Sequence, residues 1–171
     1  IISEIKFTSI SDIIQNFNPA WDSKDSQDEA FEEAVLYGTG VLKRIITRQV
    51  SVINARIIVT EAFENRTTKE IMVLEKGCPW FQHLLNMDVN NEVLFVISPG
   101  DNNAEYKVQT VKKNADTFEA RKDLLESIRG KSSEEINSIL MIDDAIFCHK
   151  AGFIASAKSL ESALKIATLS I

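Results

Sequence analysis

The stretch IFCHKAGFIASAKS, residues 146–159, contains the side chains best suited to chemistry. His149 and Lys150 can donate hydrogen bonds to an anion, and Gly152 allows a ligand to approach the backbone closely. A helix that starts near Lys158 would add free backbone N–H groups, which favour a phosphate. Two interpretations stay open. The stretch is either a tight hairpin whose polar atoms only satisfy the backbone, or a loop that binds a ligand.

Two other stretches could contribute positive charge. Lys76 lies in EKGCPW, between an expected strand and an expected helix, where free N–H groups could hold an anion. An ordinary strand-to-helix turn around a buried Trp80 is the alternative. Arg121 and Lys122 belong to a locally basic stretch, for which a solvated helix face is the alternative.

The sequence contains no hydrolytic or metal-binding motif. Its two histidines, His83 and His149, are far apart, and the patterns His-x-x-x-His, Cys-x-x-Cys and Gly-x-Ser-x-Gly are missing. We interpret the adjacent Asp143 and Asp144 as backbone caps in a turn, because neighbouring side chains on a strand point to opposite faces. On its own chemistry the chain does not look like a self-sufficient metalloenzyme.

Composition limits the classes of partner. A chain of 171 residues with 44% hydrophobic residues suits one globular domain, with or without a helical extension. The net charge of −6 and the pI near 5.0 exclude nucleic-acid binding by bulk charge, so a polyanion site must be a local patch. Cys78 and Cys148 are too few for a disulfide framework and indicate a reducing compartment. No apolar run approaches the roughly 20 residues that span a membrane. Since the chain starts at Ile1, we expect a fragment or a processed product.

The hydrophobic pattern predicts one long helix, or two nearly collinear helices, followed by a sheet. Apolar residues recur at helical spacing over residues 27–65, after a capping-box pattern at Ser26 and Glu29. Ile57 and Ile58 lie off the main apolar stripe of this helix, so one of its sides is a candidate docking surface. Further expected helices cover residues 9–17, 81–87, 133–140 and 160–171, and the expected strands cover residues 71–74, 92–98, 106–111, 146–148 and 153–155.

This order of elements predicts an α+β fold. A long N-terminal helical segment precedes a mainly antiparallel sheet of about five strands with flanking helices. The expected domains are a helical linker region at residues 1–68 and an α+β substrate-binding domain at residues 69–171.

Several blocks of the sequence, in one order, resemble a known family. Asn18-Pro19-Ala20-Trp21 is similar to its NPxW signature, and LEKGCPW and IFCHKAGFIASAKSLESAL are similar to two longer blocks. Shorter similarities occur at residues 93–99 and 108–111, at Phe118-x-x-Arg121-Lys122 and at Arg129-Gly130. The family is named for melanocyte-proliferating gene 1 (Myg) and belongs to the Asp-His-His phosphoesterase superfamily. One departure is that Ala155-Ser156 stands where the family commonly has Gly-Gly, and a Cβ at each position limits close approach of a ligand.

The resemblance implies a protein of two domains. In the family, an N-terminal domain binds divalent metal through histidines and aspartates, and a C-terminal part, similar to the superfamily's associated domain, closes over the substrate. The better-known members are 3′–5′ exonucleases that act on RNA. The resemblance therefore implies that this chain is the C-terminal, substrate-binding part of a metal-dependent phosphoesterase, with Mn²⁺ or Mg²⁺ expected only in the missing domain. It also implies an intracellular protein, of the nucleus and mitochondrion in a eukaryote or of the cytoplasm in a bacterium.

Two classes of function follow from these observations. In the first, the chain binds RNA, a short oligonucleotide or a nucleotide phosphate, and His149 shares one cleft with Arg121. The residues expected to bind substrate are Lys76, Arg121, Lys122, His149, Lys150, Gly152 and Lys158. In the second, the chain is a non-catalytic interaction module whose long helix pairs with a partner or with a second copy in a homodimer. Convergence of the polar residues in one cleft favours the first class, and an exposed apolar stripe on the helix favours the second.

Overall fold

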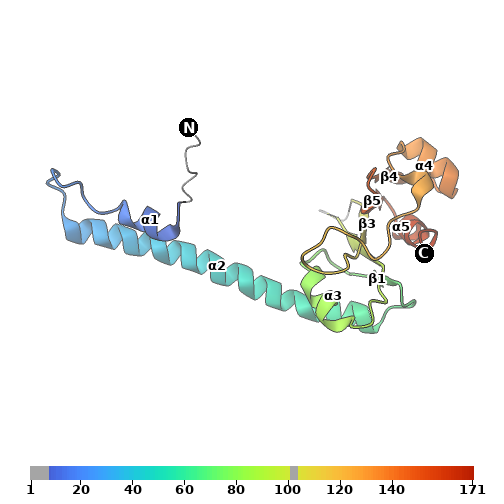
Figure 1. Cartoon of the computed structure of the whole chain (residues 1–171), viewed down its shortest axis with the longest axis horizontal. Helices are drawn as coiled ribbons and strands as arrows, with labels where there is room; N and C mark the ends of the chain where they lie inside the picture. Colours follow the sequence, from blue (N-terminus) through green and yellow to red (C-terminus); the bar gives the residue numbers. More distant parts are fainter. Residues whose placement is uncertain (1–7, 101–103) are drawn as a thin grey trace. The chain divides into compact units, whose positions relative to one another are not determined.

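The computed structural model describes residues 8–100 and 104–171, and these form the α+β structure expected from the sequence. The helices are α1 (Ile10–Gln15), α2 (Gln27–Glu64), α3 (Phe81–Met87), α4 (Ser133–Leu140) and α5 (Leu160–Thr168) (Figure 1). The strands are β1 (Ile71–Val73), β2 (Phe95–Pro99), β3 (Tyr106–Thr110), β4 (Ala145–Cys148) and β5 (Ile154–Ala157). The chain divides into two compact units, Ile1–Ser51 and Val52–Ile171, so that α2 contributes to both. Among the described residues, no helix is long and apolar enough to cross a membrane.

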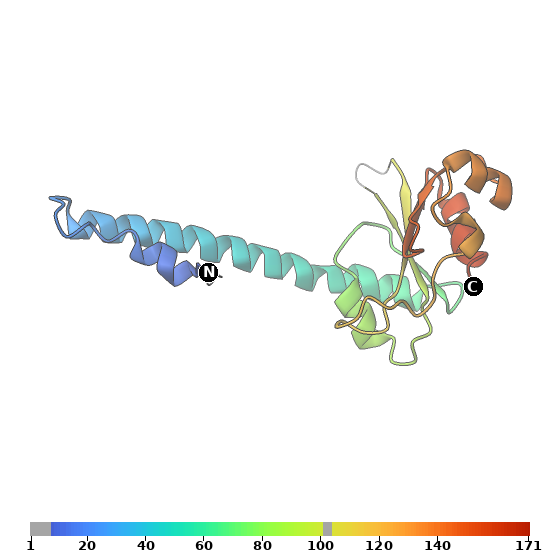
Figure 2. The same ribbon diagram turned by 45° about the horizontal axis from the view of Figure 1, so that its top comes forward.

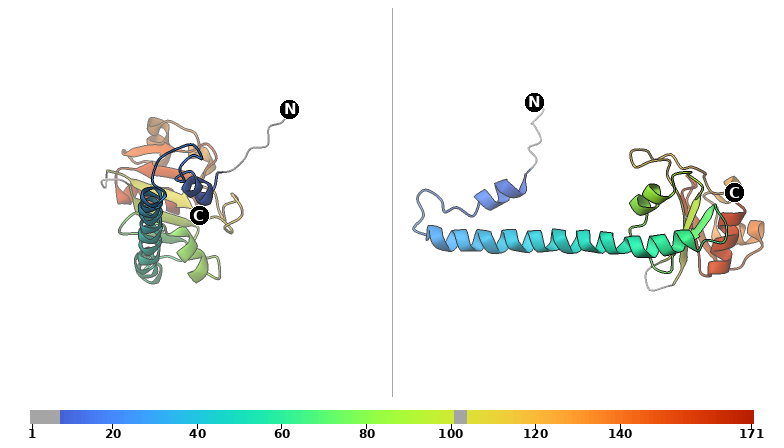
Figure 3. Two further views of the ribbon diagram at one scale, coloured as in Figure 1. Left: turned by 90° about the vertical axis from the view of Figure 1, so that its left-hand side faces the viewer. Right: turned by 90° about the horizontal axis from the view of Figure 1, so that it is seen from below.

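The first unit consists of α1 and the N-terminal part of α2. The hydroxyl of Ser26 accepts a hydrogen bond from a backbone N–H of the first turn of α2. α1 lies alongside α2, as the right panel of Figure 3 shows. The rings of Phe17 and Tyr37 are 5.4 Å apart, and a Cβ on Gly38 would lie 3.9 Å from a methyl carbon of Ile14. A small residue at position 38 therefore lets α1 pack closely on α2.

The second unit is built around a five-stranded sheet in the order β1-β2-β3-β5-β4. β1 pairs with β2 in parallel and the other three pairs are antiparallel, so the expectation of a mainly antiparallel sheet is confirmed. The expected strand at residues 92–98 starts later, at Phe95. Its first backbone N–H groups, at Glu92 and Val93, donate to the carboxylate of Asp88 at 3.0 and 2.9 Å instead of to a neighbouring strand.

Alternate side chains of β2 pack into two separate cores on opposite faces of the sheet. Phe95 and Ile97 pack in the core that α4 and α5 cover. Val96 packs in the other core, with Val59 of α2 and Leu84 of α3. Figure 2 shows this layering, with α3 on one side of the strands and α4 and α5 on the other. Helices therefore pack on both faces of the sheet, and β3 and β5 lie between the two cores.

Candidate functional site

The turn between β4 and β5 brings three of the expected site residues together. His149, Lys150 and Gly152 lie in this turn, and the predicted order of strand, turn, strand and helix start is confirmed. Gly152 has a φ of +71°, a conformation that favours glycine, and its N–H donates to the carbonyl of His149 at 2.8 Å. A Cβ on Gly152 would lie 2.6 Å from Nε of Arg129, so the arginine covers the turn from one side.

His149 both stabilises this turn and keeps one ring nitrogen for other partners. Its Nδ1 accepts a hydrogen bond from the backbone N–H of Ala151 at 3.1 Å. Because a nitrogen that accepts from an N–H carries no proton, the neutral imidazole has its hydrogen on Nε2. The imidazole packs against the ring of Phe153 in a tilted arrangement, with ring centres 4.5 Å apart and planes at 50°. The half-buried histidine therefore presents an N–H donor next to an aromatic side chain.

Phe153 and Ala151 of the same turn line a hollow of about 660 Å³, which we call the aromatic cleft. Binding pockets for small ligands typically have volumes of about 300–1,000 Å³. The residues that line the aromatic cleft are mostly aromatic or polar: Trp80, Phe81, Gln109, Thr110, Lys112, Phe118, Asp123, Ala151 and Phe153.

Lys112 occupies a position between two of these aromatic rings. Its Nζ lies 4.8 Å from the ring centre of Phe81 and 5.6 Å from that of Phe118, within the range of cation–π interactions. The side chain of Phe118 is 98% exposed, although a phenylalanine gains free energy by leaving water. A fully exposed ring beside a lysine is available to stack on a planar ligand.

The sheet register and the start of α3 position the aromatic cleft. Gln109, near the end of β3, pairs with Ile154 at the start of β5, and the carbonyl of Phe153 accepts from the backbone N–H of Thr110 at 3.0 Å. Trp80 and Phe81 begin α3 and form an edge-to-face pair with ring centres 5.7 Å apart. The loop of Phe118 is closed by an antiparallel bridge between Lys112 and Ala120.

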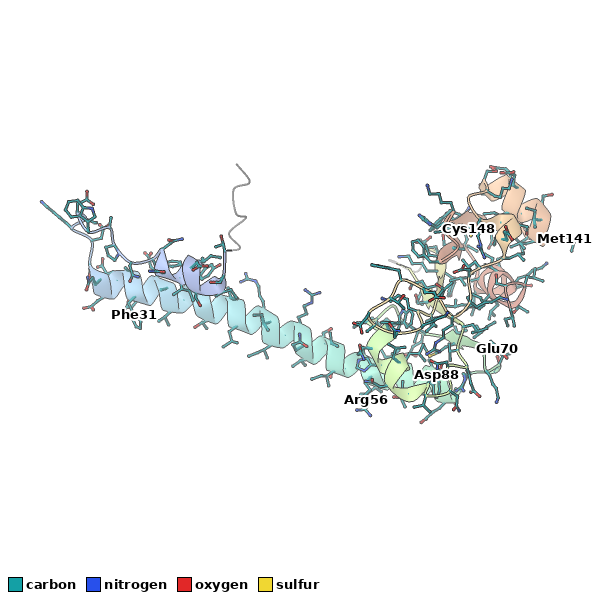
Figure 4. All side chains as sticks on the ribbon, in the orientation of Figure 1. Phe31, Arg56, Glu70, Asp88, Met141 and Cys148 are labelled. Carbon is teal, nitrogen blue, oxygen red and sulfur yellow. The ribbon has the colours of Figure 1, made fainter. Side chains whose placement is uncertain are left out.

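Arg121 does not lie in an open cleft with His149, which corrects that prediction. Its guanidinium forms an ion pair with the carboxylate of Asp88 and donates to the carbonyl of Val93 at 2.8 Å. The two charged side chains are only 5% and 1% exposed. A buried cation whose charge is already neutralised is not available to a phosphate. Figure 4 labels Asp88 near α3.

The ion pair changes the titration of Asp88. Burial by itself raises the pKa of this carboxyl, but hydrogen bonds from the N–H groups of Val93 and Glu92, together with Arg121, outweigh burial and hold the pKa below its usual value. In contrast, burial raises the pKa of the Cys148 thiol to about 11. Burial also raises the pKa of Cys78. Both cysteines are therefore protonated at neutral pH and poor nucleophiles.

The other expected site residues are exposed lysines in three separate segments. Lys76 lies in the turn before α3, Lys122 follows Arg121, and Lys158 precedes the first turn of α5. Their expected role in substrate binding stays a prediction. At the start of α5, the hydroxyl of Ser159 already accepts from the N–H of Ser162 at 3.1 Å, so one of the donors expected for an anion is used.

Sequence reasoning missed the aromatic residues and Lys112 as site residues. In the sequence, Trp80 is expected only as a buried residue in one of two interpretations of its turn, and Phe118 only as part of a sequence block. The pair Lys112-Lys113 followed by Phe118 is the signal that could have identified the site, because basic and aromatic side chains together favour nucleic acid.

The resemblance implies a divalent metal only in a separate domain, and the described residues of this chain show no site that fits one. In the described ranges, no three side chains of histidine, cysteine, aspartate or glutamate come together in a way that could hold a metal ion. The described side chains of the aromatic cleft are suited to contact with planar and anionic groups, since Lys112 lies near two aromatic rings.

Comparison with known proteins gives one consistent family. A family model described as MYG1_exonuc, uncharacterised protein family UPF0160, matches residues 3–171. The MYG1 exonuclease of Bos taurus is 34% identical over 171 residues, which cover 94% of this chain and 45% of the relative. The MYG1 protein of Saccharomyces cerevisiae is 30% identical over 176 residues, which cover 95% of this chain and 52% of the relative. The human MYG1 exonuclease is 32% identical, with coverages of 94% and 45%. The chain thus spans about half the length of the curated relatives that it matches.

Proposed function

The chain belongs to the MYG1_exonuc family, and from this premise we propose that it is the substrate-binding part of a 3′–5′ RNA exonuclease. In this proposal the aromatic cleft binds the unpaired 3′ end of an RNA. Hydrolysis belongs to a metal-binding domain outside this sequence. The observation that carries the proposal is the position of Lys112 between Phe81 and the fully exposed Phe118, at the edge of a cleft lined by two further aromatic side chains.

Stacking is the main interaction that we assign to the cleft. Proteins that bind single strands stack successive bases on aromatic side chains, and each such contact is worth roughly 1–3 kcal/mol. The bases of a duplex are stacked on each other and cannot enter a cleft of this kind. The cleft therefore favours an unpaired end, which is the substrate that a 3′–5′ exonuclease shortens.

Phosphate contacts complete the proposed binding mode. Lys112 reaches the cleft directly, and the Nε2–H of His149 lies beside Phe153 at its rim. Lys150, in the same turn, is exposed and adds a third positive or polar donor. Since the whole chain has a net charge of −6, these local groups rather than overall charge must attract the RNA.

Binding of a labelled single-stranded RNA, followed by fluorescence anisotropy, tests the proposal. Phe118→Ala should weaken binding about tenfold, which corresponds to about 1.4 kcal/mol of lost stacking. Lys112→Gln should lower the slope of log affinity against log salt by about 0.7, the value for one phosphate contact on a single strand.

The matched control for Phe118→Ala is Trp21→Ala. Trp21 is also exposed almost completely, at 96%, but it lies in the first unit and does not line the aromatic cleft. Its replacement should leave the RNA affinity unchanged. Equal losses of affinity in the two variants, or no loss in either, would show that the aromatic cleft does not bind the RNA.

The alternative function, an interaction module, is favoured by one separate observation. Large apolar side chains of α2 in the first unit are exposed, including Phe31, Leu36 and Leu42. An exposed apolar surface of this kind suits contact with another protein surface.

A further inference from the structure

An apolar stripe on the N-terminal part of α2 is open to solvent in the part of the chain that the structure describes. Its members recur at helical spacing and are 48% to 69% exposed: Phe31, Val35, Leu42, Ile46 and Val50. Figure 4 labels Phe31 at one end of this stripe. A groove of about 610 Å³ lies between α1 and the stripe, lined among others by Phe31, Val35 and Leu42. Contiguous exposed apolar surface of this kind marks an interaction site.

The charged residues of this part of α2 are segregated along the helix. The N-terminal part is acidic, and the basic residues follow only after the middle of the segment, around Gly38. Among the described residues, none of these side chains forms an ion pair within the chain. The acidic residues are Asp28, Glu29, Glu32 and Glu33, and the basic residues are Lys43, Arg44 and Arg48.

Two of these charges flank the stripe on one side of the helix. Glu32 and Lys43 are eleven residues apart, which is three turns of an α-helix, so their side chains project in nearly the same direction. Both lie next to members of the stripe, on the side opposite to Gly38, which α1 covers. A second helix seated on the stripe would therefore meet both charges.

These charges decide the direction of a helix that pairs with its own copy. In a parallel pair the two-fold axis runs along the helices and puts the same flank of the two copies on opposite sides of the interface, so Glu32 and Lys43 meet no partner of opposite charge from this flank. In an antiparallel pair, Glu32 of each copy lies beside Lys43 of the other, with the two-fold axis near Gly38. The same arrangement places Val35 opposite Leu42 and brings the stripes of both copies together.

We propose that a second copy of this chain occupies the stripe, as an antiparallel pair of α2 helices with two reciprocal Glu32–Lys43 contacts. The proposal is independent of the aromatic cleft and goes beyond RNA binding. The surface is self-complementary in both hydrophobic pattern and charge, which is the requirement for a two-fold interface.

Charge reversal tests the register by sedimentation velocity over a concentration series from micromolar to millimolar. Glu32→Lys and Lys43→Glu should each weaken the dimer about tenfold, because two attractions become two repulsions. The double variant Glu32→Lys, Lys43→Glu restores both contacts and should dimerise like the unchanged chain. In a parallel pair these charges make no such contact, and each single variant should keep the affinity of the unchanged chain. That result, or loss of affinity without rescue in the double variant, contradicts the antiparallel register.

The matched control is Arg48→Glu. It makes the same charge reversal in the same basic segment, but it lies about 140° around the helix from Lys43, away from the stripe. The dimer of this variant should have the affinity of the unchanged chain. If Arg48→Glu weakens the dimer as much as Lys43→Glu does, the effect is one of net charge and the proposed contacts are wrong.

Distances between spin labels give a readout that does not depend on affinity. Labels at Thr39, close to the two-fold axis, should lie near each other in the dimer. Each Asp28 lies about ten residues from the two-fold axis, which is about 15 Å along the helix at 1.5 Å per residue. Labels at the two copies of Asp28 should therefore be separated by about 30 Å. Short distances at both positions would show a parallel pair. A chain that stays monomeric at every concentration would overturn the proposal and leave the stripe to a different partner.

Discussion

Asp88 and Arg121 form a buried ion pair that joins the end of α3 to the loop of Phe118. Asp88 follows α3 directly, and the backbone N–H of Arg121 donates to the carbonyl of Val111, just after β3, at 2.8 Å. The same carboxylate accepts from the backbone N–H groups of Glu92 and Val93. This pair thus connects the two segments that supply Phe81 and Phe118 to the aromatic cleft.

Asp88→Asn should destabilise the second unit by about 3–5 kcal/mol, because it leaves the buried charge of Arg121 without a partner. Urea unfolding followed by circular dichroism measures the change. Glu119→Gln is the control, since it removes a carboxylate from the exposed ion pair with Lys113 and should change stability little. Equal stability of Asp88→Asn and the unchanged chain would show that the pair does not hold the fold.

The lowered pKa of Asp88 also predicts a pH dependence. A carboxyl whose pKa is lower in the folded state stabilises the fold above its ordinary, unfolded pKa, and this stabilisation is lost as the pH falls through the folded pKa. The unchanged chain should therefore lose stability towards acid more steeply than Asp88→Asn, which has no such carboxyl. Parallel acid profiles of the two proteins would contradict this assignment.

His149→Ala should weaken RNA binding about tenfold and leave the fold intact, as expected for the loss of a hydrogen bond to a charged phosphate. The N–H of Ala151, which His149 caps, lies on an exposed residue and can bond to water instead. His83→Ala is the matched control: Nε2 of His83 lies 2.8 Å from the carbonyl of Val52, outside the aromatic cleft. The variant His83→Ala should lower the stability of the fold without changing its affinity for RNA. If His149→Ala unfolds the second unit and its folded fraction binds RNA normally, the histidine is only structural.

Gly152→Ala should unfold the β4–β5 turn locally and weaken RNA binding, because the residue has a positive φ and its new Cβ would collide with Arg129. Gly40→Ala makes the same chemical change inside α2, where the nearest atom would be a flexible arginine nitrogen at 3.5 Å. There the substitution should stabilise the helix by up to about 1 kcal/mol. Thermal unfolding measures the stability of both variants. If Gly152→Ala is as stable as the unchanged chain and binds RNA with full affinity, the β4–β5 turn is not part of the binding site.

The chain alone should not hydrolyse RNA, since its described residues include no set of ligands for a metal ion. Incubation of the purified chain with labelled short RNA and Mn²⁺ tests this expectation. Cleavage that requires the metal and elutes with the chain in every chromatographic step would show that the residues we assign to binding also support catalysis.

Local patterns predicted the elements of the fold well. The expected helix at residues 133–140 is α4, and Ser132 and Glu135 form a capping box at its start. The long periodicity after Ser26 marked α2, and the turn at Gly152 marked the β4–β5 hairpin. Each of these signals acts over a few residues, so the sequence contains it directly.

The partners of the site residues could not be predicted in the same way. Arg121 pairs with Asp88, which is distant in sequence, and only the folded sheet brings them together. The same holds for Phe81 and Phe118, whose rings both lie near the Nζ atom of Lys112. An arginine next to a lysine looks like an exposed basic patch until the tertiary fold shows which of the two is buried.

Photo-crosslinking of an RNA with 5-iodouridine at its 3′ end tests the central claim most directly, because this base reacts with the aromatic ring on which it is stacked. Mass spectrometry of the digested complex should place the crosslink on an aromatic residue of the cleft, Trp80, Phe81, Phe118 or Phe153. The same RNA with the label at its 5′ end should not crosslink there. A 3′-end crosslink that maps to Trp21 or to Phe31, outside the cleft, would contradict our account.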